Sequence, residues 1–355
     1  MITEGIFNLW KTYAEQGDAE AMYNLGECYS NGDYVTQDKE KAFEWYKKAA
    51  ELGYLDALCS LGYCFFKGEC VPQNYAKAVE LWEKAASQGH VDAQSKLGAC
   101  YFCGYGVSTN LKKAVELWTV AAENGNASAQ SSLGGCYANG WEVHQNYKKA
   151  VELWTEAAKK DDALAQESLG NCYADGTGVP QDYEKAVELW IKAAEQGNAW
   201  AQASLGCSYM DGTGVTKNYE KAVVWFKKSA MQGDSRAQCK LGECYHYGKG
   251  VKEDLETAVE WYTKSAEQDH AEAQYNVGKC YFNGEGVSQD YNKAIEMLTK
   301  SAEQGYVEAQ YLLGIMNMIA QYYSQALEWF MKAAEQGHKE ASEKAQEVYN
   351  LLKSN

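Results

Sequence analysis

The sequence predicts an all-α solenoid of stacked two-helix repeats, each 36 residues long, and two recurring features support this prediction. A Leu-Gly pair returns every 36 residues, beginning at Leu25, Leu61, Leu97, Leu133, Leu169, Leu205, Leu241 and Leu313, with Val277 in the remaining slot. A large side chain returns in the second half of the units, at Trp10, Tyr46, Trp82, Trp118, Trp154, Trp190, Phe226, Tyr262 and Leu298. Repeat lengths between about 20 and 50 residues are typical of solenoids, whose units bury their apolar faces only against neighbours.

The segment Asp162–Gly197 shows how one unit is built. Its first half carries apolar or small residues at intervals of four, which predicts a helix with a narrow packing face. The glycines and the proline of residues 175–180 end that helix, because glycine adopts positive φ and proline cannot continue it. Asp182 is placed to cap a second helix, and Gly197 to end it. The unit is therefore a helical hairpin that needs neighbours on both sides.

The repeats divide the chain into three parts. We expect residues 1–17 to form only a second-type helix, residues 18–337 to form nine repeats, and residues 338–355 to form a polar capping helix. In this last segment Ala345 and Gln346 stand where the next Leu-Gly pair would fall. Stacked repeats also suit a chain of 355 residues, because a single globular core rarely grows past about 300 residues.

Composition and charge narrow the classes of function. Lys and Arg total 33 against 49 Asp and Glu, which gives a formal charge of −16. This charge argues against nucleic acids and anionic membrane surfaces as partners, since both attract basic proteins. The first residues lack the basic and apolar regions of a signal peptide, and no apolar stretch approaches the ~20 residues of a membrane span. We therefore expect a cytoplasmic protein.

The repeat resembles a known family. Ala165–Gly197 follows the pattern A-x-x-x-L-G-x-x-Y-x-x-G-x-G-V-x-x-D-x-x-K-A-x-x-x-W-x-K-A-A-E-Q-G, which is similar to the Sel-one-like repeat, a longer relative of the tetratricopeptide repeat. The similarity extends over essentially the whole chain. It implies a right-handed superhelix whose first helices line the concave side, and it implies the role of a scaffold or adaptor.

The cysteines do not predict a metal or a cofactor. Seven of the twelve share one repeat position, at Cys28, Cys64, Cys100, Cys136, Cys172, Cys244 and Cys280. Stacked helices lie ~8–10 Å apart, whereas a disulfide requires Cα atoms within about 7 Å, so we expect free, largely buried thiols there. Cys207, Cys239 and His246 fall on adjacent first helices, but no fourth ligand accompanies them, and the sequence leaves their convergence open.

The resemblance leaves two functions open for this chain, a scaffold and a secreted ligand-binding protein or hydrolase. Some relatives in the family are secreted, cysteine-rich and β-lactam binding, so a secreted-type ligand-binding protein or hydrolase is the alternative. Their cysteines resemble pairs that join the two helices of one hairpin, whereas no second helix contains a cysteine here, and no Ser-x-x-Lys nucleophile motif stands out. The sequence therefore favours a non-enzymatic scaffold for protein–protein interaction, with no catalytic residues.

A partner segment is expected along the concave groove. The spacing of the related tetratricopeptide repeat implies these groove residues: Tyr23, Tyr63, Phe66, Phe102, Trp200, Met210, Arg236, Cys239, Lys240, His246, Tyr247, Tyr275, Lys279 and Phe282. Large aromatic and Arg side chains are the usual anchors of binding energy. The acidic total favours a basic protein or peptide, although Arg236, Lys240 and Lys279 make one end locally positive. We expect the segment to be anchored between Trp200 and Lys279.

Overall fold

The computed structural model describes residues 4–354, in which it has twenty α-helices and no strand. The predicted ends of the chain, residues 1–3 and 355, lie outside the described residues. Within the described part, no helix combines the length and the apolar character that crossing a membrane requires. The fold class is therefore all-α, as predicted.

The helices divide into two compact units, with the boundary after Gln181. Unit 1 holds α1 (Glu4–Glu15), α2 (Ala19–Asn31), α3 (Lys39–Glu51), α4 (Leu55–Lys67), α5 (Tyr75–Ala86), α6 (Val91–Cys103), α7 (Leu111–Glu123), α8 (Ala127–Asn139), α9 (Tyr147–Ala158) and α10 (Ala163–Asp175). Unit 2 holds α11 (Tyr183–Glu195), α12 (Ala199–Asp211), α13 (Tyr219–Met231), α14 (Ser235–Tyr247), α15 (Leu255–Ala266), α16 (Ala271–Asn283), α17 (Tyr291–Glu303), α18 (Val307–Ile319), α19 (Tyr323–Glu335) and α20 (Lys339–Ser354).

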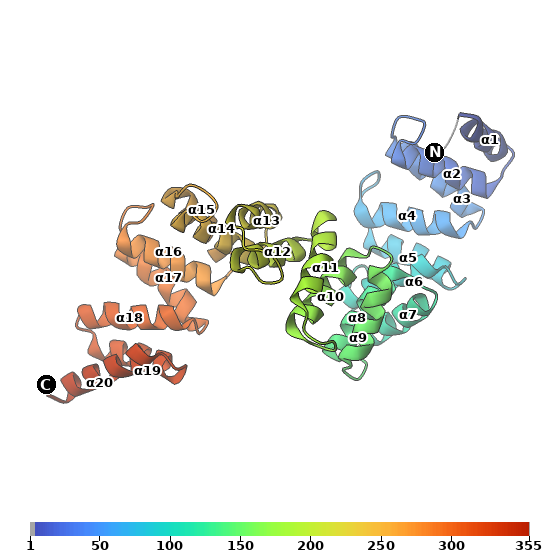
Figure 1. The fold of residues 1–355 in the computed structure, drawn as a ribbon. Helices are drawn as coiled ribbons and strands as arrows, with labels where there is room; N and C mark the ends of the chain where they lie inside the picture. Colours follow the sequence, from blue (N-terminus) through green and yellow to red (C-terminus); the bar gives the residue numbers. More distant parts are fainter. Residues whose placement is uncertain (1–3, 355) are drawn as a thin grey trace. The chain divides into compact units, whose positions relative to one another are not determined.

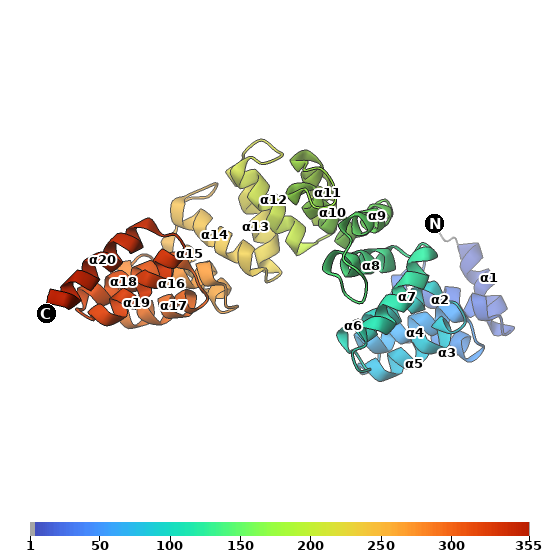
Figure 2. The same cartoon turned by 90° about the horizontal axis from the view of Figure 1, so that it is seen from below.

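Each unit is a stack in which every helix packs against the next one along the chain. Figure 1 shows α18, α19 and α20 layered in this way at the C-terminal end of unit 2, and Figure 2 shows the layers of both units from below. Helices with even numbers are the first helices of the hairpins, and those with odd numbers are the second. This arrangement confirms the predicted solenoid of two-helix repeats.

Side chains at the N-terminal ends of the helices accept hydrogen bonds from backbone N–H groups of the first turn. The carboxylate of Asp182 accepts the N–H of Lys185, as predicted. Histidine has the same role at three inter-repeat turns, because Nδ1 of His90, His270 and His338 accepts a backbone N–H at 3.1–3.3 Å. The three histidines occupy the same inter-repeat turn, and helix capping explains why they recur there.

Within each unit, the glycine that follows the recurring Leu or Val makes room for the large side chain of its own hairpin. The pairs are Gly26 with Tyr46, Gly62 with Trp82, Gly98 with Trp118 and Gly134 with Trp154 in unit 1, and Gly206 with Phe226, Gly242 with Tyr262, Gly278 with Leu298 and Gly314 with Phe330 in unit 2. A Cβ added at any of these glycines would lie 2.5–2.7 Å from that side chain, closer than real contacts allow. The two recurring sequence features are therefore the two sides of one contact.

Buried glutamines connect successive hairpins of unit 2. Nε2 of Gln238 donates to the carbonyl of Ala230 in the preceding hairpin at 3.2 Å, and its Oε1 accepts from Gln268 in its own hairpin at 2.8 Å. Gln202 and Gln274 repeat both contacts. Each of these polar side chains is thus satisfied only when two hairpins are stacked, which favours a single relative position of the hairpins.

A few turns carry non-glycine residues in the left-handed region. Asp161 and Asp269, which replace the usual glycine after a second helix, have φ of 60° and 59°. Gln321, in the shortened last repeat, has φ of 63°. Side chains other than Gly, Asn and Asp are disfavoured in this conformation, so Gln321 occupies the most strained of the three positions.

Candidate functional site

The first helices of unit 2 border a cavity of about 380 Å³. It is lined from α12 by Cys207 and Asp211, from α14 by Arg236 and Lys240, and from the start of α16 by Glu272, together with apolar side chains of α11 and α13. Most of the predicted residues between Trp200 and Lys279 belong to these same three helices. We therefore take this cavity and its rim as the candidate site.

The polar wall of the cavity is an ion-paired cluster. The ammonium of Lys240 lies 3.0 Å from a carboxylate oxygen of Glu243 and 3.0 Å from one of Glu272. Burial by itself would lower the pKa of Lys240, but the two carboxylates outweigh it and hold that pKa above its ordinary value. Lys240 is therefore a fixed positive charge that is already neutralised, which reduces the local positive charge predicted from the sequence.

An exposed aromatic–cation pair lies at the rim. The guanidinium carbon of Arg236 is 4.2 Å from the ring centre of Trp200, and Trp200 remains 58% exposed. Stacking of this kind holds both side chains in place while leaving the outer ring surface open. Trp200 and Arg236 therefore provide a preformed anchor next to the cavity.

The other predicted residues of unit 2 differ in how accessible they are. Tyr247 is 55% exposed, whereas the ring of Tyr275 packs against Tyr306 with centroids 5.3 Å apart. Lys279 is half-buried on α16. Phe282 lines a separate, apolar hollow of about 420 Å³ near the shortened last repeat. Of this group, Tyr247 has the surface that partner binding needs.

Two predicted groove residues are buried, which corrects their assignment. Met210 is 9% exposed and packs in the core around Phe226. Cys239 is 0% exposed, because it faces the start of α16 rather than solvent. Neither has surface to offer a partner, so both leave the candidate site.

The predicted aromatic residues of unit 1 mostly fill gaps between helices. Tyr23 packs against Tyr46 and Tyr54, and Phe66 packs against Trp82. Phe102 packs between Trp118 and Trp141. Tyr63, in contrast, is exposed, and two lysine ammonium groups lie over its ring. Three of these four rings are half-buried against other aromatic side chains, which indicates a structural role in unit 1.

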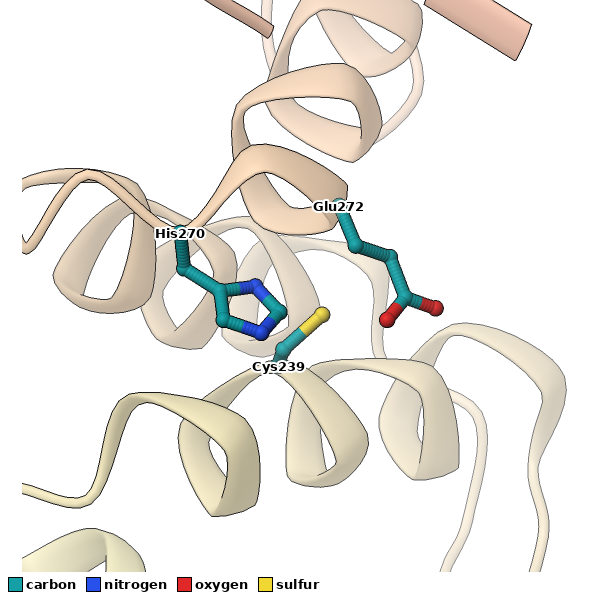
Figure 3. A group of neighbouring side chains, drawn as sticks. All are labelled: Cys239, His270 and Glu272. Carbon is teal, nitrogen blue, oxygen red and sulfur yellow. The ribbon is translucent and has the colours of Figure 1, made fainter. Parts of the chain in front are cut away.

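The structure answers the question of Cys207, Cys239 and His246. Cys239 lies with His270 and Glu272, whereas His246 lies in a separate group with Cys280 and Glu285. In each group the ligand atoms are within 4.8 Å of one another. Figure 3 shows the first group, in which the Cys239 thiol on α14 points to the two side chains at the start of α16. The three residues whose convergence the sequence left open therefore do not meet: Cys239 and His246 lie in different clusters, and Cys207 belongs to neither.

The cysteines at the shared repeat position are buried, as expected, except that Cys64 is half-buried. Burial raises the pKa of the Cys100, Cys136 and Cys172 thiols to about 11. At neutral pH these groups are therefore protonated and behave as small apolar side chains.

Tandem helical hairpins that stack along the chain define the helical-repeat class of proteins. Members of this class use the surface formed by successive repeats for protein interaction, and in unit 2 the first helices border a cavity. Within this class the chain belongs to the Sel1 repeat family. The Sel1 repeat model matches nine segments, at residues 19–54, 55–90, 91–126, 127–162, 163–198, 201–234, 235–270, 271–306 and 307–338. Proteins of this family are typically non-catalytic scaffolds for protein interaction.

Two solved structures are similar over most of the chain. One is a protective antigen present in uropathogenic Escherichia coli strains, which displays an SLR fold; it is 37% identical, the match covers 94% of this chain and 73% of that one, and the TM-score is 0.72. The other is a Sel1 repeat protein from Oxalobacter formigenes, which is 32% identical over 87% of this chain and 89% of that one, with a TM-score of 0.56. A comparison with curated proteins gave no match.

Proposed function

We propose that this chain is a non-enzymatic scaffold that binds an extended segment of another protein across α12, α14 and α16. The observation that carries the proposal is the Trp200–Arg236 pair beside a cavity whose walls are largely apolar. Trp and Arg dominate the binding energy of protein interfaces when they are preorganised around a pocket. The exposed ring of Tyr247, on the same helix as Arg236, extends this surface along α14.

The partner is a basic segment with an apolar or aromatic anchor residue. The formal charge of −16 attracts basic chains over a distance, and it disfavours nucleic acids and anionic membranes. The carboxylate of Asp211, at the end of α12, lines the cavity together with Glu272. Lys240 is already paired with Glu272, so Asp211 is the acidic group that a basic side chain would meet first. A cytoplasmic location suits this role.

Alanine substitution of the anchor tests the proposal. A variant with Trp200→Ala, Arg236→Ala and Tyr247→Ala should retain its thermal stability, because these side chains are largely exposed. Partners captured from the source cell by the wild-type protein would be identified by mass spectrometry. The bound segment would then be synthesised and its Kd measured by calorimetry. Loss of an interface anchor should weaken binding at least about 30-fold, which corresponds to about 2 kcal/mol.

A second aromatic–cation pair in the same unit provides the matched control. On α13, the ammonium of Lys228 lies 4.1 Å from the ring centre of Trp225. Because α13 is a second helix, a Trp225→Ala and Lys228→Ala variant removes the same chemistry from the other side of the hairpin. Its Kd should match the wild type. If the α13 variant lost binding while the Trp200 variant kept it, the first helices would not be the binding surface.

A further inference from the structure

The last turn of α14 and the loop after α16 bring together three groups that can bind a metal ion. His246 lies on α14, Cys280 on α16, and Glu285 just beyond the end of α16, and one ligand atom from each lies within 4.8 Å of the others. Nε2 of His246 is 3.7 Å from Oε2 of Glu285. The cluster adjoins the surface proposed above for the partner segment, because the ring centres of His246 and Tyr247 lie 4.4 Å apart.

The glutamate is held in position by its surroundings. Its backbone N–H donates to the carbonyl of Cys280 at 3.0 Å, so the thiol and the carboxylate are joined by one tight turn. The side chain of Asn283 donates to Oε1 of Glu285 at 3.1 Å, which leaves Oε2 for another partner. A carboxylate oriented in this way is a typical feature of metal sites, where outer hydrogen bonds fix the ligands.

Two buried atoms of this cluster have no hydrogen-bond partner. They are Nδ1 of His246 and Oε2 of Glu285. Unsatisfied buried polar atoms are rare in folded proteins, and an ion that the structure does not contain is one of the few explanations for them. A cation between Nε2 of His246 and Oε2 of Glu285 would satisfy the unpartnered oxygen, and Nδ1 would then carry the ring proton.

The donor set and the spacing suit a late first-row divalent metal. Zinc bonds of about 2.0–2.1 Å place a tetrahedral nitrogen and oxygen ligand about 3.3–3.4 Å apart. Nε2 of His246 and Oε2 of Glu285 are 3.7 Å apart, so the two atoms would approach each other slightly when the metal binds. Burial lowers the pKa of His246, which favours the neutral form of the imidazole that metals bind. Among the neighbouring charges, Glu285 and Glu253 raise the pKa of His246, whereas Lys279 lowers it.

A similar cluster nearby does not have these properties. In the group of Cys239, His270 and Glu272, shown in Figure 3, Nδ1 of His270 already accepts the N–H of Ala273 at 3.3 Å. Because Nδ1 accepts this hydrogen bond, a neutral ring carries its proton on Nε2. Nε2 then has no lone pair available for a metal ion. Glu272 is also ion-paired with Lys240 at 3.0 Å. This second cluster is satisfied without a metal ion and therefore serves as an internal control.

We propose that His246, Cys280 and Glu285 form a site for one divalent transition-metal ion of the zinc type. The three protein ligands would leave a fourth position open to water or to a ligand from outside the chain. Cys280 would bind as a thiolate, and its proton would pass to solvent when the metal binds. Because this proton must be released, binding should tighten as the pH rises.

Cobalt provides the test, because a Co²⁺–thiolate bond has its own absorption. Reduced protein, freed of metals by a chelator, is titrated anaerobically with Co²⁺. We expect a charge-transfer band and the visible bands of tetrahedral Co²⁺ to saturate at one equivalent and to disappear when Zn²⁺ is added. Absence of a thiolate band at one equivalent would overturn the proposal.

Single variants identify the ligands. Cys280→Ser should abolish the charge-transfer band, and His246→Gln and Glu285→Gln should each weaken Co²⁺ binding at least about 10-fold. Cys239→Ser should bind as the wild type does. The proposal fails if the band survives Cys280→Ser or is lost in Cys239→Ser. If Cys280→Ser does not fold, the less buried His246 and Glu285 decide, because unchanged affinity in both variants would also overturn the site.

Discussion

Two adjacent glycines of α8 should respond in opposite ways to substitution by alanine. A Cβ at Gly134 would lie 2.6 Å from Nε1 and 2.8 Å from Cδ1 of Trp154. A Cβ at Gly135 would meet nothing within 4 Å. Both residues lie inside the same helix, so the backbone contribution of the substitution is similar at the two positions. The difference between the variants therefore measures the contact between Gly134 and the ring.

The expected magnitudes come from three contributions. Replacing an interior helical glycine by alanine stabilises by about 0.5–1 kcal/mol, and at Gly135 nothing opposes this gain. At Gly134, overpacking costs about 1–3 kcal/mol. Moving the ring of Trp154 also breaks its 3.0 Å hydrogen bond from Nε1 to the carbonyl of Ser131, and leaving a buried partner unsatisfied costs about 1–3 kcal/mol. Because one ring movement causes both losses, we expect Gly134→Ala to be about 2–4 kcal/mol less stable than Gly135→Ala.

Urea denaturation of the full chain, followed by far-UV circular dichroism, measures this difference. Long repeat arrays do not always unfold in one step, so the comparison should use the first transition that both variants share with the wild type. Equal stability of the two variants would refute the reasoning, since the contact would then have no energetic consequence.

The pH dependence of stability, one turn substitution and thiol reactivity provide three more tests. Burial lowers the pKa of His246, so in the metal-free protein the unfolded chain binds more protons than the folded chain below pH ~6.5. The unfolding free energy should therefore fall as the pH falls through this range, and His246→Gln should reduce the fall. An unchanged pH profile in this variant would contradict the prediction. Gln321→Gly should raise the unfolding free energy by about 1 kcal/mol, because φ at this position is 63°; a lower denaturation midpoint would count against this reading. Iodoacetamide should label the exposed Cys103 long before Cys100 and Cys136, and similar labelling rates by peptide mass spectrometry would be inconsistent with their burial.

The fold could be predicted because its determinants recur. The Leu-Gly pair and the large side chain of each unit are in contact, so their common period of 36 residues reports one interaction repeated along the chain. The helix ends were predictable where Asp or Gly marks them, as at Asp182 and Gly197. The histidine caps were missed, since histidine is not among the residues preferred at that position.

The site was less predictable because it depends on how neighbouring helices approach each other. Met210 and Phe66 occupy equivalent repeat positions, yet the first is buried and the second half-buried, since different side chains surround them. His246 and Cys280 are 34 residues apart, and the turn that brings Glu285 to them cannot be derived from the period. Repetition fixes what is common to all units, whereas a binding site arises where one unit differs.

The contact between the glycine and the large side chain lies within a hairpin and not between hairpins, and this affects how such a gene can change in length. Each 36-residue unit encodes both halves of its own closure, so an in-register duplication or deletion copies or removes a complete fit. Substitution of the large side chain likewise requires no compensating change in another unit, and Trp, Tyr, Phe and Leu all occur there. Single repeats can thus be gained, lost or diversified one at a time, while a site such as the one proposed around Trp200 is acquired in a single region of the array.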